Sequence, residues 1–178
     1  MGIRKRVLPD DVRRDLDARS KRALARRLPW PYNGMVSDIT SAVQKCSNYL
    51  AATGLICYTE ACGRQLFRNG KAGDNFECFK AFLAYIGASE VLQWPLRLNG
   101  KELKFYEAIR NGLVHAYFAQ AERGGVALTT RSKEGQQTGF VRRGDAEFWI
   151  AVVPYLNLFS NALEKAQAER LLEQGWKR

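Results

Sequence analysis

The residues best suited to chemistry lie within the run RNGLVHAY at positions 110–117. Arg110 offers a permanent cation, Asn111 a polar hydrogen-bonding group, and His115 a base that titrates near neutral pH. His115 is also the only histidine of the chain. Phosphodiester cleavage without a metal ion needs a cation for the phosphate and a general acid or base for the proton. The run therefore indicates that kind of chemistry.

The run falls within a segment that we expect to form one amphipathic helix from Asn99-Gly100 to about Glu122. A turn of about 100° per residue places Glu107, Asn111 and His115 on one polar stripe. The opposite, apolar stripe consists of Ile109, Leu113 and Ala116. Arg110 falls on the shoulder between them. It must reach around the helix to join His115, or come from a second copy of the chain.

The pattern RNxxxHxY resembles the R-x(4–6)-H signature of the HEPN domain superfamily, through Arg110, Asn111, His115 and Tyr117. The tyrosine two residues after the histidine is similar to that of HEPN toxins paired with nucleotidyltransferase antitoxins. The resemblance covers about residues 35–173, but only the motif is specific. It implies a bundle of four or five helices that forms a homodimer and brings two motifs into one cleft.

The resemblance further implies a metal-independent endoribonuclease of toxin or phage-defence type, with RNA as partner and no cofactor. The 2′-hydroxyl of the RNA would attack the phosphate that Arg110 holds, while His115 takes the 2′-proton or protonates the leaving 5′-oxygen. Asn111 would orient the phosphate or the imidazole. Tyr117 matches the position that antitoxin nucleotidyltransferases adenylylate. Ordinary packing beside Phe118 explains this tyrosine equally well.

Two other functions stay open. One is a catalytically inactive HEPN-type module that binds nucleotides or RNA as a regulator. The other is a basic helical DNA-binding protein in which His115 is incidental, although no helix-turn-helix spacing is evident. The sequence contains no Gly-rich phosphate loop followed by Lys-Ser/Thr and no second histidine for a nucleophile triad.

Composition fits one soluble domain with an attached arm. The chain has 178 residues, of which 46% are apolar, and a net charge of +10. Such a charge favours a polyanionic partner, although excess arginine also simply improves solubility. No stretch is apolar enough to span a bilayer, and the basic N-terminus lacks the apolar core of a signal peptide. We therefore expect no membrane partner and a cytoplasmic location.

The four cysteines do not suggest a metal site. They contain no Cys-x-x-Cys pair, and a single histidine makes a poor zinc set with them. All four fall within apolar stretches, so we expect reduced core residues and no bound metal. They are Cys46, Cys57, Cys62 and Cys78.

Residues 1–33 are expected to form a basic N-terminal arm, distinct from a main domain at 34–178. The first 28 residues hold ten Lys or Arg against four Asp. A helix is predicted from Pro9-Asp10-Asp11 to the stop at Pro29-Trp30-Pro31. Its apolar contacts would be Val12, Leu16, Leu24 and Leu28. Its candidates for binding the RNA backbone are Arg13, Arg14, Lys21 and Arg22; loose packing of a solvated helix is the alternative.

The main domain should begin with a helix from about Met35, capped by Ser37 or Asp38 and running to about Ala52. Beyond a possible interruption at Gly54, residues 55–62 are apolar nearly all round and predict a central helix. Glu60 lies inside this segment, where a carboxylate needs a partner. It either bonds the backbone or Arg64, or orients the functional site.

The remaining pattern predicts a mainly α fold, with a HEPN-like helical bundle of four to five helices and a small antiparallel β-meander before the last helix. Asp74 should cap an aromatic helix, extended by helical turns at 89–92. Period-two alternation at about 125–153 predicts the meander. Pro154 should open the last helix, which ends near Gln174. Its inward positions would be Leu156, Phe159, Leu163 and Ala166.

Overall fold

A computed structural model describes residues 8–25, 28–67, 74–94, 96–98, 101–110, 113, 125–130, 133–144 and 147–173. The helices are α1 (Asp10–Ala25), α2 (Trp30–Gln44), α3 (Asn48–Phe67), α4 (Asn75–Tyr85), α5 (Phe105–Arg110) and α6 (Val152–Ala168). The strands are β1 (Leu96–Leu98), β2 (Lys101–Leu103), β3 (Gly125–Thr129), β4 (Phe140–Arg143) and β5 (Glu147–Ala151). Short 3-10 helices are η1 (Ser89–Gln93), η3 (Glu134–Gln136) and η4 (Leu171–Glu173). The prediction of a mainly helical fold with a small sheet before the last helix is confirmed.

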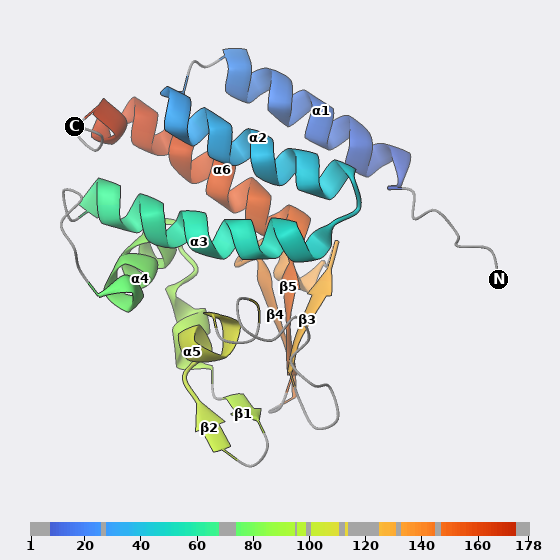
Figure 1. Ribbon diagram of the computed structural model, residues 1–178, viewed down its shortest axis with the longest axis vertical. Helices are drawn as coiled ribbons and strands as arrows, with labels where there is room; N and C mark the ends of the chain where they lie inside the picture. Colours follow the sequence, from blue (N-terminus) through green and yellow to red (C-terminus); the bar gives the residue numbers. More distant parts are fainter. Residues whose placement is uncertain are drawn as a thin grey trace.

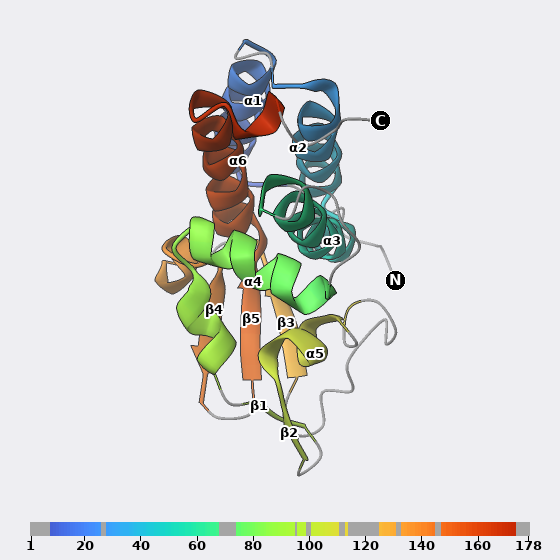
Figure 2. The same cartoon turned by 90° about the vertical axis from the view of Figure 1, so that its left-hand side faces the viewer.

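Helices α1, α2, α3 and α6 form one end of the molecule, and the three-stranded sheet lies at the other (Figure 1). Helices α2, α3 and α6 contact one another, and α1 lies against α2 on the outside. Strand β5 leads directly into α6, which ties the sheet to the bundle. Seen from the side, α4 and α5 lie in front of the sheet, and the β1–β2 hairpin extends below it (Figure 2). Helix α3 is therefore the element that meets both the bundle and α4.

The three-stranded sheet has the order β3-β5-β4 and is not the antiparallel meander that the sequence predicted. Strand β4 pairs antiparallel with β5, but β3 pairs parallel with β5, from Gly125 opposite Glu147 to Thr129 opposite Ala151. A parallel pair needs a long crossover, and the chain between β3 and β5 supplies one that includes η3 and β4. Within it, Gly139 has a φ of +77°, and its carbonyl accepts a hydrogen bond of 2.9 Å from the N–H of Ala151. This bond extends the β4–β5 pairing, which lies on the side of β5 opposite to β3.

Aromatic side chains fix α5 against the sheet. The ring of Phe105, at the start of α5, lies 5.1 Å from that of Phe140 and 5.0 Å from that of Phe148. The ring of Trp94 also meets that of Phe105 edge-on, with the centroids 6.0 Å apart. Because fully buried aromatic side chains dominate the energy of a core, this cluster anchors the helix that carries Arg110.

Helix α1 is part of the hydrophobic core. Val12 and Leu16 are fully buried, and both belong to the same cluster of buried residues as α2 and α6. The prediction of apolar contacts along this helix is confirmed for these two positions and for Leu28; Leu24 belongs to α1, but its side chain lies outside the described part of the chain. The division expected at residue 33 falls inside α2.

The boundary between α2 and α3 differs from the prediction. Helix α2 begins at Trp30, with Pro31 in its first turn, so a cap at Ser37 or Asp38 was wrong. The helical conformation is interrupted at residues 45–47, where Cys46 adopts a φ of 58°, and not at Gly54. Proline tolerates the first turn of a helix because that turn's N–H groups need no helical partner, which is why the stop signal for α1 also starts α2.

The helix predicted from residues 99–122 was wrong at its start. Lys101–Leu103 is strand β2, paired antiparallel with β1 so that Leu96 lies opposite Leu103 and Leu98 opposite Lys101. Helix α5 begins only at Phe105. The pairing leaves Asn99-Gly100 between the strands, and Asn-Gly is typical of two-residue hairpin loops. Residues 111–112 and 114–124 lie outside the described residues.

The other predicted elements are confirmed, with small shifts. Asp74 caps α4 by accepting a hydrogen bond of 2.8 Å from the N–H of Phe76, and the turns after α4 form η1. Helix α6 starts at Val152, two residues before Pro154, and its four predicted inward residues are buried. It ends at Ala168, so the predicted end near Gln174 was wrong, and the turn η4 follows it. Among the helices that the structure describes, none has the length and apolar character needed to cross a membrane.

The cysteines are only partly as expected. All four are free, and Cys62 and Cys78 are buried. Cys57 is exposed and Cys46 is half-buried, so the prediction of four core residues was wrong for both. Helix α3 explains the difference, because Cys57 lies on its outer side while Cys62 faces the core.

Candidate functional site

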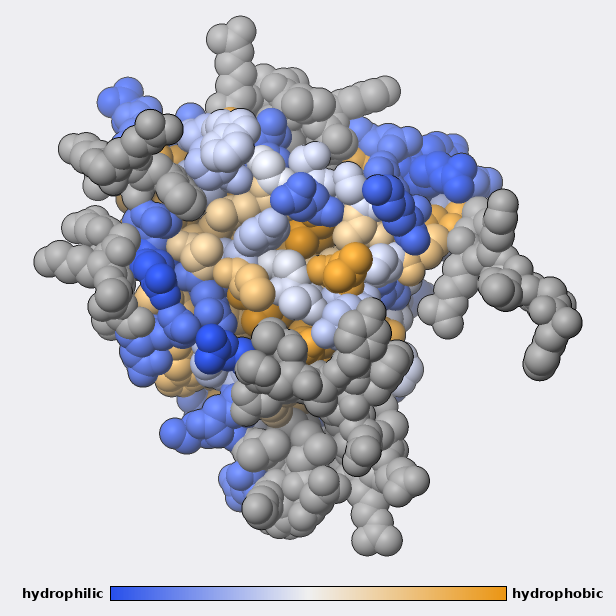
Figure 3. Space-filling model, viewed as in Figure 1, coloured by the Kyte–Doolittle hydropathy of each residue, from blue (hydrophilic) through white to orange (hydrophobic). Residues whose placement is uncertain are grey.

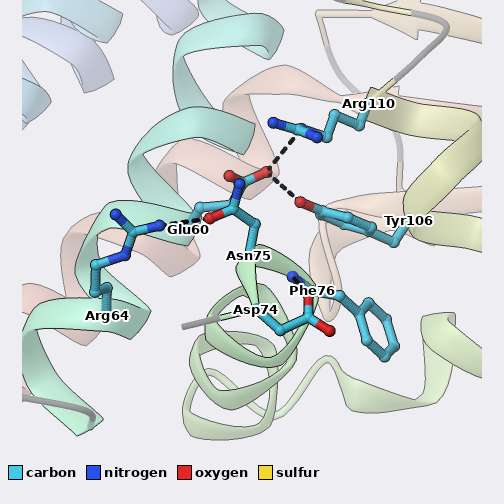
Figure 4. Close-up of polar contacts among 7 residues, drawn as sticks. All are labelled: Glu60, Arg64, Asp74, Asn75, Phe76, Tyr106 and Arg110. Carbon is cyan, nitrogen blue, oxygen red and sulfur yellow. Dashed lines mark hydrogen bonds and ion pairs between the residues drawn. The ribbon is translucent and has the colours of Figure 1, made fainter. Parts of the chain in front are cut away.

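Three polar side chains from α3 and α5 meet beside the N-terminal end of α4 (Figure 4). The hydroxyl of Tyr106 donates a hydrogen bond of 2.8 Å to Oε1 of Glu60. The same oxygen lies 3.7 Å from Nε of Arg110. Glu60 comes from the middle of α3, whereas Tyr106 and Arg110 are one turn apart on α5, so the contact depends on how these two helices pack.

Packing holds the Tyr106 side chain in place. Its ring centroid lies 5.4 Å from that of Phe76 and 5.2 Å from that of Phe79, both on α4. Burial is the largest cause that raises the pKa of the Tyr106 phenol, followed by the hydrogen bond to Glu60. The nearby cation of Arg110 acts in the opposite direction. Tyr106 is thus a protonated donor at neutral pH.

Glu60 has a different partner from the one considered first. Its contacts are Tyr106 and Arg110 rather than Arg64. Arg64 instead hydrogen-bonds the side-chain oxygen of Asn75, the first residue of α4 (Figure 4). The two residues are one turn apart on α3, yet they tie that helix to two different neighbours. Glu60 joins α3 to α5, and Arg64 joins α3 to α4.

Arg110 is the accessible member of the cluster. Its side chain is 44% exposed, against 15% for Glu60. An approach of 3.7 Å is too long for a direct hydrogen bond, so the attraction is mainly electrostatic. Partly exposed ion pairs contribute only about 0–1 kcal/mol, which leaves the guanidinium free to interact with an incoming anion as well.

The exposure of α5 agrees with the stripes drawn from the sequence. Glu107 is exposed, whereas Ile109 and Leu113 are buried. The hydroxyl of Tyr49, near the start of α3, donates to the carbonyl oxygen of Leu113, which ties the chain just beyond α5 to the bundle. Helix α5 is therefore held against the sheet at its start, and the chain just beyond its end is held to α3.

The structure places only part of the predicted site. Asn111, His115 and Tyr117 lie outside the described residues. Arg110 and Glu60 are brought together, which the sequence could not show because the two lie fifty positions apart on separate helices. The contribution of Tyr106 was missed. Its position four residues before Arg110, on the same side of a helix, was the available signal.

Cys57 lies one turn before Glu60 on α3 and is also close to Arg110. Partial burial of the thiol is the largest cause that raises its pKa, and the carboxylate of Glu60 adds to this effect. The guanidinium of Arg110 lowers it. The exposed thiol therefore reports the charges of the Glu60–Arg110 pair.

The basic residues of α1 are far from this cluster. Arg13 and Arg14 are exposed, and Nε of Arg14 donates to the carbonyl oxygen of Asp10 at 3.4 Å. Both views place α1 at the opposite end of the molecule from α5 (Figures 1 and 2). Lys21 and Arg22 belong to α1, but their side chains lie outside the described part of the chain. The structure does not unite Arg13 and Arg14 with Arg110.

The surface over α3 is mixed in character. Apolar side chains gather near the middle of the face that carries α2 and α3, and hydrophilic side chains surround them (Figure 3). Leu50, at the start of α3, is 59% exposed.

In the described part of the chain, no three His, Cys, Asp or Glu side chains come close enough to hold a metal ion.

Comparison with protein-family models, with curated proteins and with solved structures finds no match to the chain. The HEPN resemblance therefore depends on the run from Arg110 to Tyr117.

Proposed function

We propose that the chain is a metal-independent endoribonuclease of toxin or phage-defence type, built on a HEPN-like helical bundle. Arg110 binds the scissile phosphate, His115 transfers the proton, and Asn111 orients the phosphate or the imidazole. RNA is the substrate, and a second copy of the chain supplies a second motif to the same cleft. The proposal extends to a cytoplasmic location and to a nucleotidyltransferase antitoxin that would modify Tyr117.

The observation that carries the proposal is the environment of Arg110. The helix that ends at Arg110 is anchored to the sheet by Phe105 and to α3 through Tyr106. Its side chain is nonetheless 44% exposed. The backbone of Arg110 is thus held by the anchored helix, while its side chain is accessible to solvent. Such an arginine suits the binding of a phosphate whose negative charge increases during the reaction.

The exposure of α5 also supports the proposed roles of Asn111 and His115. Glu107 is on the exposed side of α5, and Leu113 is buried. The sequence projection at about 100° per residue places Asn111 and His115 on the same polar stripe as Glu107. Both side chains would then be available to an RNA strand that Arg110 holds.

The reaction follows from the groups that the proposal assigns. The 2′-oxygen loses its proton to a base and attacks the phosphorus, and the bond from phosphorus to the 5′-oxygen breaks. The leaving oxygen takes a proton, so the products are a 2′,3′-cyclic phosphate and a 5′-hydroxyl. His115 serves as the base or the acid, since a histidine side chain can both accept and release a proton near neutral pH. Arg110 stabilises the added negative charge on the phosphate.

One observation favours a second candidate, a catalytically inactive module that binds nucleotides or RNA. The carboxylate of Glu60 lies beside Arg110 and compensates its charge. Such a compensated cation would still bind a phosphate. It would stabilise a developing negative charge less well than an isolated arginine would.

The deciding experiment incubates the purified protein with end-labelled RNA in EDTA, beside the variants Arg110→Ala and His115→Ala. Arg143→Ala, on β4, removes the same charge at an exposed position of the sheet and serves as the control. We expect cleavage by the wild type and by the control, and none by the two motif variants. Cleavage that survives in both motif variants would overturn the assigned mechanism. Binding of RNA without cleavage by the wild type would favour the inactive module.

A further inference from the structure

We propose that Glu60 and Tyr106 are positioning residues for Arg110. Tyr106 fixes the carboxylate of Glu60, and this carboxylate restrains the guanidinium from its Nε side. The outer edge of the guanidinium is then presented to the scissile phosphate. The inference rests on the proposed function and adds to it two side chains outside the RNxxxHxY motif.

The geometry makes one oxygen the centre of the arrangement. Oε1 of Glu60 accepts the hydrogen bond of 2.8 Å from the Tyr106 hydroxyl and lies 3.7 Å from Nε of Arg110. Tyr106 and Arg110 are separated by one helical turn, so they project from the same side of α5 toward α3. A movement of the carboxylate would therefore change both contacts at once.

The inner members of the arrangement are held by the core. Thr59, beside Glu60, is fully buried and shares a hydrogen bond of 2.7 Å with the hydroxyl of Tyr155 on α6. Gly63, one turn later, lies directly against the backbone of Cys78 on α4. These contacts fix the turn of α3 that carries Glu60, and the hydrogen bond from Tyr106 then fixes its carboxylate beside the arginine side chain.

Rigidity on one side and exposure on the other is what an oriented phosphate ligand needs. An arginine side chain loses considerable rotamer freedom when it binds, and a restraint made in advance reduces that loss. Glu60 also lowers the net positive charge that a phosphate meets on approach. Removing its charge should therefore leave ground-state binding of RNA equal or tighter, while the reaction itself becomes slower.

The kinetic test uses Glu60→Gln and Tyr106→Phe, each of which keeps the shape of the side chain. We expect kcat to fall about tenfold or more in both variants with KM unchanged or lower, because small misplacements of a catalytic group can cost up to about a hundredfold. Glu77→Gln, at an exposed pair with Lys80 on α4, is the matched control for charge and should keep both constants. Thermal unfolding of each variant separates loss of the fold from loss of position.

The direct test follows the Nε–H resonance of Arg110 by nuclear magnetic resonance, assigned through its disappearance in Arg110→Lys. In the wild type we expect the carboxylate of Glu60, 3.7 Å from Nε, to shift this resonance and to slow its exchange with solvent relative to the two variants. In Glu60→Gln and Tyr106→Phe the resonance should shift and exchange faster. An Nε–H resonance with the same shift and exchange rate in both variants would overturn the inference, whether or not the protein cleaves RNA.

The two proposals fail in different ways. Cleavage that does not require Arg110 and His115, or no cleavage at all, removes the proposed function, and the resonance of Arg110 then decides the positioning alone. Cleavage that requires both residues but proceeds with wild-type kcat in Glu60→Gln removes only the positioning role.

Discussion

The closeness of α3 to α4 leads to a graded prediction for three glycines. A Cβ added at Gly63 would overlap the carbonyl group of Cys78, with its carbon at 2.6 Å, whereas non-bonded carbon atoms prefer about 3.5–4.0 Å. The obstacle is backbone, so no side chain can rotate away. At Gly54 the added atom would overlap only the terminal methyl of Ile39, its other neighbours lying at ordinary contact distances of 3.8 and 4.0 Å, and at Gly34 it would meet nothing within 4 Å.

The expected free energies follow from these surroundings. Alanine in place of a helical glycine stabilises by about 0.5–1 kcal/mol where space is free, which we expect for Gly34→Ala. Overpacking costs about 1–3 kcal/mol and more against backbone, so Gly63→Ala should be destabilised by about 2 kcal/mol or more after the gain in helix propensity. Gly54→Ala should fall between the two, because a methyl group can shift by rotation of the Ile39 side chain.

Urea unfolding followed by circular dichroism measures this series. We expect Gly34→Ala to unfold at the highest urea concentration and Gly63→Ala at the lowest. The midpoints of the wild type and of Gly54→Ala should lie between them, and the slopes of the unfolding curves should be unchanged. Equal stability of Gly63→Ala and Gly34→Ala would show that α3 and α4 do not approach as described. In that case the support that α4 gives to Tyr106 would also be in doubt.

Three further predictions concern α1 and the polar cluster. Leu16→Ala should cost about 2–5 kcal/mol in urea unfolding because the side chain is fully buried, whereas a loosely attached arm would lose nothing. Tyr106→Phe should lower the free energy of unfolding at neutral pH. Because the pKa of Tyr106 in the folded protein lies above the ordinary value of 10.0, the difference in stability from the wild type should shrink as the pH rises above that value. A difference that stays constant with pH would argue against the hydrogen bond to Glu60. Alkylation of Cys57 should be faster in Glu60→Gln and slower in Arg110→Ala, measured by mass spectrometry of the modified peptide, and equal rates would contradict the assigned charges.

The local elements could be predicted because their signals lie within a few residues. Asp74 before an aromatic stripe gave the start of α4, and buried positions at helical spacing gave the inward side of α6. Val12 and Leu16 identified the buried side of α1. Each of these signals reflects a repeat or a cap that a single helix satisfies by itself.

The hairpin was missed although its signal was also local. Leu96-Arg97-Leu98 and Lys101-Glu102-Leu103 flank Asn99-Gly100, and an Asn-Gly pair between short alternating segments is a strong hairpin signal. The same residues also suit the start of a helix, and the amphipathic stripe beyond Phe105 favoured that interpretation. The segment forms strands because the backbone N–H and C=O groups of β1 and β2 can hydrogen-bond to one another.

The site itself could be predicted only in its parts. Arg110 and Glu60 each stood out by type and position, but their contact depends on how α3 and α5 pack, which no spacing in the sequence encodes. The same holds for the parallel pairing of β3 with β5, since the strand that follows in the chain is not the strand that lies beside it.

The position of β5 has a consequence for how the molecule forms. β5 lies at the centre of its sheet but comes last of the three strands in the chain. During synthesis β3 and β4 have no mate until β5 emerges, and β4 then gains a nearby antiparallel neighbour while β3 must close a longer loop. Because Phe148 of β5 is one of the aromatic contacts of Phe105, α5 and its terminal arginine acquire their final support only at this late stage. A nascent or truncated chain that lacks β5 would thus contain the whole RNxxxHxY motif but lack the packing that holds α5 and Arg110 in position.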